Sequence, residues 1–170
     1  MVSDKRWVGI IAAVLTVSLC FINACSEKKT EEKIAEKMLK QTTGKDVDVK
    51  MEKDKITFEE KGSKTEMAQT STWPSEMTND VPRFTKGKIE RVVKTQQEGD
   101  AWTYNVYLLG ITGDDIKNYE GALKEKGWQT SLMQVEGKGG YLNAQKGTMG
   151  MNFGFSVEKK DGVLAVYNRP

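Results

Sequence analysis

The chain has 170 residues, 38% of them hydrophobic and 29% charged, a composition typical of a globular protein and too apolar for a disordered one. Its 26 basic and 24 acidic residues leave a formal net charge of +2, which predicts no nucleic-acid partner. The sequence has no histidine, which excludes Ser-His-Asp and Cys-His catalysis and histidine-ligated metal centres, because each requires an imidazole.

Residues 1–24 are predicted to be a secretory signal peptide. Lys5 and Arg6 are followed by an uncharged, largely apolar run at residues 8–22. A run of about 15 residues is too short for a membrane span, which needs roughly 20, but it suits the apolar region of a signal peptide. The peptide ends in Ile-Asn-Ala-Cys at residues 22–25, which resembles the lipobox of bacterial lipoproteins, where the cysteine receives the lipid.

Cys25 is predicted to be the lipidation site of the mature protein. The other cysteine, Cys20, would leave with the signal peptide, so no disulfide could form in the mature chain. Acyl chains on Cys25 would anchor the protein to a membrane, with residues 25–30 as lipidated cysteine and tether. Ser26 resembles an outer-membrane sorting residue, if the cell has two membranes. Alternatively, Cys25 merely lies near the end of the signal, or the segment is an uncleaved anchor.

Residues 31–72 are predicted to form a helix followed by a small three-stranded β-meander. Residues 31–41 place apolar side chains at helical spacing, and Thr30 can cap the start of this helix. Apolar and polar residues then alternate in three short segments, as they do in strands joined by hairpins. These predicted strands lie at residues 47–51, 55–59 and 64–68.

Residues 73–87 are predicted to be an ordered connector. Two of the chain's three prolines lie here and restrict the backbone. Trp73, Val81 and Phe84 are the apolar side chains expected to anchor the connector by packing.

Residues 88–170 are predicted to form an antiparallel sheet with one main packed helix. The helix is expected at residues 114–126, where Thr112 and Asp115 have the spacing of a capping box and Gly127 can end the helix. Strands are expected at residues 89–95, 102–109, 130–135, 141–145, 149–157 and 163–167. The strand at 102–109 has apolar side chains on both faces, with Tyr107 and Leu109 on the second, so it is expected to be covered on both sides. The fold class is therefore α+β, with residues 31–170 forming one compact unit.

The mature chain also resembles a widespread set of bacterial lipoproteins of unknown function. The resemblance rests on the helix, Thr-Gly and alternating Val-Asp of residues 30–50, on Trp-Pro at 73–74, on Asp-Val-Pro at 80–82, on Gly-Lys-Ile at 87–89, and on Tyr119, Leu123, Gly127 and Trp128. It supports the lipoprotein and fold predictions, and it assigns no active-site residue.

Paired carboxylates offer little for catalysis or metal binding. Asp46 and Asp48 share a strand face and could meet a hard cation, but such pairs are usually the solvated face of an edge strand. Asp114 and Asp115 are explained by helix capping. No cofactor and no metal site is expected. Methionines at residues 149 and 151, which could bind copper through sulfur, are expected to pack in the core instead.

Two glycines and several aromatic residues are candidates for a binding surface. Gly150 and Gly154 alternate on one face of a strand, where they could leave a groove for a ring or backbone, or admit a closely packed helix or a bulge. Four aromatic side chains could contact a partner or simply pack in the protein. These possible binding or packing aromatics are Trp73, Trp102, Tyr104 and Tyr107.

The sequence therefore predicts an exported, lipid-anchored protein of the cell envelope, a non-catalytic binding or structural module for a protein partner or ligand. Its expected partners are the membrane, through Cys25, and an envelope protein or a glycan. The alternative is a histidine-independent enzyme that acts on cell-wall or lipid substrates through carboxylates. A pure spacer is a third possibility.

Overall fold

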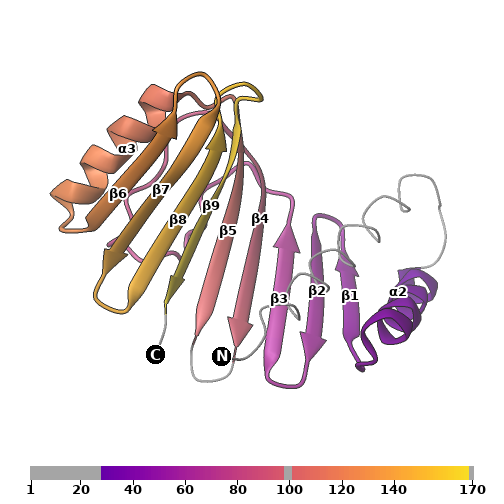
Figure 1. Ribbon diagram of the computed structural model, residues 1–170. Coiled ribbons are helices and arrows are strands. Elements are labelled where there is room, and N and C mark those ends of the chain that lie inside the picture. The colour runs from indigo at the N-terminus through magenta and orange to yellow at the C-terminus, as the bar shows by residue number, and fades with distance from the viewer. Residues whose placement is uncertain (1–27, 98–100, 169–170) are drawn as a thin grey trace. The chain divides into compact units, whose positions relative to one another are not determined.

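The computed structural model describes residues 28–97 and 101–168. The chain divides into two compact units, with the division between Lys61 and Gly62. The domain boundaries proposed from the sequence, at residues 72–73 and 87–88, stay a prediction. The predicted α+β class is confirmed, since each unit combines antiparallel strands with a helix (Figure 1).

The first unit packs a helix on a β-hairpin. Helix α2 (Lys28–Thr43) is followed by β1 (Asp48–Glu52) and β2 (Lys55–Glu60), which pair antiparallel. The helix begins inside the predicted tether at residues 25–30, because nothing in its first turn breaks a helix. Its carboxylates also complete β1: Glu36 Oε1 accepts a hydrogen bond from the Val49 amide at 3.1 Å, and Glu32 Oε1 accepts one from the Met51 amide at 2.8 Å.

This unit has a small core, because a two-stranded hairpin covers only one side of a helix. Ala35 and Leu39 are buried against Val49. Ile34 and Met38, predicted to belong to the same apolar stripe, are each 50% exposed. The third predicted strand, β3 (Ser63–Ala68), pairs with β4 and belongs to the second unit.

The second unit is an antiparallel sheet with a helix, α3 (Gly113–Glu125), on one face. Its strands run in the order β3-β4-β5-β9-β8-β7-β6 (Figure 1). Beyond β3, they are β4 (Lys88–Gln97), β5 (Trp102–Leu109), β6 (Gln129–Val135), β7 (Gly139–Lys146), β8 (Met149–Ser156) and β9 (Asp161–Asn168).

The predicted ends of the main helix are confirmed. Thr112 Oγ1 accepts a hydrogen bond from the Asp115 amide at 3.3 Å, and Asp115 Oδ2 accepts one from the Thr112 amide at 2.9 Å, which completes a capping box. Gly127, at φ +80°, takes the left-handed conformation that ends the helix. Trp128 then folds back, with its amide donating to the Leu123 carbonyl at 3.0 Å.

The core of this unit lies between the sheet, α3 and the connector. Phe153 is fully buried, and its ring packs edge-on against Phe84 of the connector, with ring centroids 5.2 Å apart. Phe84 in turn meets Tyr119 of α3 at 5.1 Å. Val81 is also buried and Trp73 packs against the core, so the predicted anchors of the connector do pack.

Candidate functional site: the uncovered face of the second unit

The opposite face of this sheet is covered by no other described element of the second unit. Side chains alternate along each strand, so those that do not point toward α3 share this surface, called the uncovered face below. Tyr107 and Leu109 lie on it, and Leu109 is 41% exposed. The expectation that β5 is covered on both sides is therefore wrong within this unit, because α3 and the connector both pack on the same side.

Few charged side chains occupy the uncovered face. Among the described strand residues that lie there, the charged ones are Lys88, Glu90, Arg91 and Asp161. Lys88, Glu90 and Asp161 gather at the strand ends beside Leu109. The interior rows carry Arg91 and otherwise glycine, amide, hydroxyl, aliphatic and tyrosine side chains. In a chain with 29% charged residues, this is a strong local depletion.

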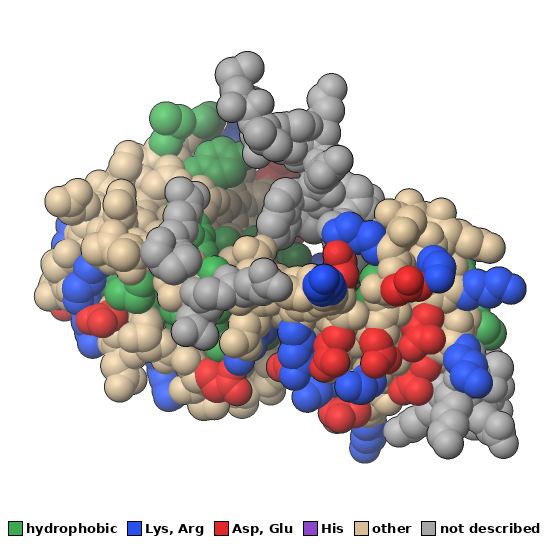
Figure 2. All heavy atoms as spheres, turned by 90° about the horizontal axis from the view of Figure 1, so that it is seen from below, with side chains coloured by type: hydrophobic (Ala, Val, Ile, Leu, Met, Phe, Trp, Pro, Cys, Tyr) green, Lys and Arg blue, Asp and Glu red, His purple; other side chains and the backbone are tan. Residues whose placement is uncertain are grey.

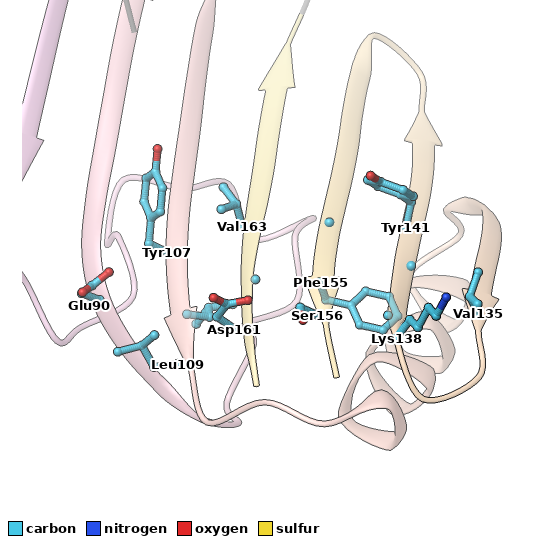
Figure 3. Close-up of a pocket in the computed structure, with 15 residues that line it drawn as sticks. Glu90, Tyr107, Leu109, Val135, Lys138, Tyr141, Phe155, Ser156, Asp161 and Val163 are labelled. Atoms are coloured by element: carbon cyan, nitrogen blue, oxygen red, sulfur yellow. The ribbon is translucent and has the colours of Figure 1, made fainter. Parts of the chain in front are cut away.

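The uncovered face contains a shallow hollow of about 500 Å³. Tyr107 of β5 stands on one side of it and Tyr141 of β7 on the other, with Val163 of β9 between them (Figure 3). Gly154 of β8 also lines it. At one end the lining becomes polar, with Lys138, Ser156, Asp161 and Glu90. The hollow therefore has an apolar middle, two tyrosine walls and a charged end.

Two tyrosine rings lie next to glycines of β8, but at different distances. A Cβ added to Gly154 would lie 3.4 Å from the Tyr141 ring, an ordinary contact, so this position has room for a methyl group. A Cβ added to Gly150 would lie only 2.4 Å from the Tyr167 ring, so that ring occupies the space a side chain would fill. Gly154 thus lines the hollow that the sequence suggested, whereas the space above Gly150 is taken by Tyr167. Helix α3 packs on the other side of the sheet.

Arg91 fixes the Tyr107 wall. Its guanidinium carbon lies 4.0 Å from the centroid of the Tyr107 ring, a cation–π contact. The Arg91 Nε is buried and has no hydrogen-bond partner among the described residues. The contact that the structure shows for this guanidinium is the stacking on Tyr107.

The other aromatic candidates serve packing. Tyr104 is 4% exposed on the covered side, where its hydroxyl donates to Glu76 Oε2 at 3.1 Å. Burial raises the pKa of Tyr104, and the nearby Lys94 opposes that rise. Trp102 packs edge-on against Tyr104, with centroids 5.3 Å apart, and Trp73 packs against the core. Of the four predicted aromatics, Tyr107 is the one that lines the hollow.

Two tyrosines of this face were missed by the sequence analysis. Tyr141 is 59% exposed and lies opposite Gly154, and Tyr167 lies opposite Gly150. The signal that could have revealed them is cross-strand: each ring is registered against a glycine of β8. That register depends on which strands are neighbours, which the sequence alone does not provide.

Three of the four carboxylate candidates have structural partners. Asp46 pairs with Lys40 at 2.5 Å, Asp114 lies 3.5 Å from Lys117, and Asp115 caps α3. Asp48 belongs to an exposed groove of the first unit, where basic and acidic side chains are interleaved, as the blue and red side chains at the right of Figure 2 show. Among the described residues, no three acidic or cysteine side chains are grouped closely enough to hold a metal ion.

The methionine candidates lie in or against the core. Met151 is 2% exposed and Met149 packs against the same cluster. Both therefore support the packing role expected from their strand period rather than a copper site.

Comparison with known proteins gives no relative: no family model matches the chain, and neither a curated protein nor a solved structure is detectably similar. The resemblance to uncharacterised bacterial lipoproteins stays a prediction. The signal peptide and Cys25 lie outside the described residues. No helix in the described ranges, 28–97 and 101–168, has both the length and the apolar character to cross a membrane.

Proposed function

We propose that this protein is a lipid-anchored module of the cell envelope that binds a partner or ligand through the uncovered face. The observation that supports this most directly is the hollow between Tyr107 and Tyr141, on a face whose interior rows carry one charged side chain, Arg91, among the described residues. Exposed aromatic and aliphatic side chains on a charge-depleted patch are unusual on protein surfaces, and where they occur they mark interaction sites. Cys25 would supply the attachment to the membrane.

The proposed role is binding rather than catalysis. Of the four acidic side chains considered as candidates, Asp115 caps a helix and Asp46 and Asp114 pair with lysines. The two carboxylates that do line the hollow are Glu90 of β4 and Asp161 at the start of β9. Acid–base catalysis by two carboxyl groups needs two different environments, so that one group stays protonated while the other is ionised. An open surface provides no buried environment that would keep one of these carboxyl groups protonated.

Photocrosslinking in living cells tests the binding role. A benzophenone amino acid placed at Ser131, exposed on the uncovered face, is compared with one at Lys117, exposed on α3. Benzophenone inserts into C–H bonds, so it captures protein, glycan and lipid alike. The proposal expects a recurrent adduct from position 131 that is absent from position 117. Adducts of equal yield from both positions, or none from position 131, would contradict it.

Membrane fractionation tests the anchor separately. The Cys25→Ala variant should lose the mass of the acyl chains and leave the membrane fraction. A variant that remains in the membrane fraction would contradict lipidation at Cys25 without bearing on the uncovered face.

A further inference from the structure

We propose that the ligand of the uncovered face is an uncharged glycan chain, held on a platform of two tyrosine rings and the amide pair between them. The platform is defined by Tyr141, Asn143, Asn152 and Tyr167. This inference rests on the binding role proposed above and names the chemistry of its ligand.

The first element of the platform is a pair of rings next to the glycines of β8. Tyr167 rests on Gly150, and Tyr141 lies beside Gly154 with room for a methyl group between them. A glycine is required at position 150, because any Cβ there would meet the Tyr167 ring at 2.4 Å. The result is two flat apolar surfaces, each with a hydroxyl at its tip.

The second element is an amide pair between the rings. Asn152 follows Gly150 and precedes Gly154 on the same face of β8, and its Nδ2 donates to Asn143 Oδ1 at 2.5 Å. This bond leaves the Asn143 amide nitrogen and the Asn152 carbonyl oxygen for other partners. One of these groups donates hydrogen bonds and the other accepts them.

More uncharged polar groups continue past Tyr167. A second hollow, of about 390 Å³, is lined by Gln129, Ser131, Gln145, Thr148 and Tyr167, together with the two asparagine-bearing strands. Its polar side chains are amides and hydroxyls, and none of its lining residues is charged. The uncovered face therefore offers donors and acceptors without a net field.

A sugar chain matches both the aromatic rings and the uncharged hydrogen-bonding groups of the uncovered face. Each pyranose ring presents an apolar C–H face, which can stack on an aromatic ring, and hydroxyls that both donate and accept hydrogen bonds. Asparagine and glutamine side chains can both donate a hydrogen bond to a sugar hydroxyl and accept one from it. Anionic polymers fit less well, because Arg91 is the one cation in the interior rows among the described residues. The cation that lines the hollow, Lys138, is offset there by Glu90 and Asp161.

The spacing of the rings predicts a chain rather than a single sugar. Gly150 and Gly154 are four residues apart on β8, which corresponds to roughly 13 Å along an extended strand. A monosaccharide cannot contact both rings at once, whereas an oligosaccharide can. Affinity should therefore rise with chain length until both rings are engaged.

The test uses the full-length protein in a detergent without a sugar headgroup, applied to an array of uncharged oligosaccharides that includes two- to eight-unit chains of glucose and of N-acetylglucosamine. Three variants accompany it: Tyr141→Ala, Tyr141→Phe, and Met38→Ala, which removes an apolar side chain that is 50% exposed on α2 of the first unit. Circular dichroism melts confirm that each variant folds.

The proposal predicts binding that strengthens with chain length and weakens by about tenfold in Tyr141→Ala, since a buried aromatic contact contributes roughly this much. Tyr141→Phe should retain most of the affinity, because the ring remains, and Met38→Ala should match the unaltered protein. Affinity that is equal for all chain lengths, or that is unaffected by Tyr141→Ala, would overturn the platform.

The oligosaccharide array, together with the photocrosslinking, also distinguishes the glycan proposal from the more general proposal of a binding face. If no oligosaccharide binds while the photocrosslinker at position 131 captures a protein in cells, the glycan is refuted and the binding face stands. If it captures a lipid, the glycan is again refuted. If neither assay gives a signal, both proposals fail.

Discussion

The two faces of the sheet in the second unit are built from the same strands but by different rules. The covered face carries Phe153, Leu164 and Val106, each fully buried, and excludes water with α3 and the connector. The uncovered face carries glycine, asparagine and tyrosine at the alternating positions. One face is selected for packing, which needs volume, and the other keeps flat rings and hydrogen-bonding groups at the surface.

The two faces of the sheet also differ in how their charged side chains are placed. On the covered side, charged groups of the strands find partners on the connector: Lys94 pairs with Glu76, and Lys146 pairs with Asp80 at 2.6 Å. The uncovered face keeps few charges in its interior rows, although it has no packed core to protect. A surface that only needed to be soluble would be expected to carry charge, so the depletion favours a binding role.

The largest difference between the faces should appear when an aromatic ring is removed from the covered one. Phe153→Ala would empty the centre of the core, where the ring contacts Phe84, Tyr119 and Phe155. The expected loss is about 3–5 kcal/mol in the free energy of unfolding. Urea denaturation followed by tryptophan fluorescence measures it. A loss below about 1 kcal/mol would show that the core is not centred on this ring.

A smaller effect is expected at Tyr119, whose hydroxyl donates to the Pro82 carbonyl at 2.9 Å. Tyr119→Phe leaves that carbonyl without its partner and should cost about 1–3 kcal/mol at neutral pH. Burial raises the pKa of Tyr119, so its stabilising contribution is complete below the unfolded-state pKa of about 10 and is lost as the pH rises above it.

The difference in stability between Tyr119→Phe and the unaltered protein should therefore shrink as the pH is raised from 9 toward 11. Urea melts at intervals across this range check it. A difference that stays constant would mean that the phenol is not buried as the fold requires.

A substitution on the uncovered face should act through the rings rather than the core. Gly150→Ala places a methyl group 2.4 Å from the Tyr167 ring and must displace it, at a cost of about 1 kcal/mol. Gly154→Ala is the matched control, because its methyl would make ordinary contact with Tyr141 at 3.4 Å. NMR resonances of the Tyr167 ring should shift in the first variant and not in the second; equal shifts would contradict the arrangement.

The smallest effect on stability is expected at Tyr141. Its side chain is 59% exposed, so Tyr141→Ala should change the free energy of unfolding by less than about 0.5 kcal/mol. Together, Tyr141→Ala and Phe153→Ala compare the loss of an aromatic ring from each face of the sheet. A loss above about 2 kcal/mol would show that Tyr141 is part of the folded core, which would undermine its role in binding.

Local patterns were enough to predict most of the fold. Strong alternation identified β8, and the capping box with Gly127 placed the ends of α3. Non-local features were not predictable. Which strand lies beside which decides that Tyr141 meets Gly154, and no local pattern contains that information. For the same reason, the sequence favoured Trp102 and Tyr104, which pack, and missed Tyr167.

The extent of burial was also not predictable from local sequence patterns. The stripe of α2 suggested that Ile34 and Met38 would pack with Ala35 and Leu39, but a two-stranded hairpin is too narrow to cover all four. Tyr107 and Leu109 were expected to be covered because they are apolar. Leu109 is exposed and Tyr107 is half-buried, because α3 packs on the other face of the sheet.

The most direct test of the account is to ask whether the uncovered face is occupied in the cell. Brief oxidative labelling of intact cells is compared with labelling of the purified protein, with side-chain modification read by mass spectrometry. Met133 and Tyr141 report on the uncovered face, and Met38, half-exposed on α2, is the reference. The account predicts that Met133 and Tyr141 are protected in cells relative to Met38. Equal reactivity of all three in cells and after purification would contradict it.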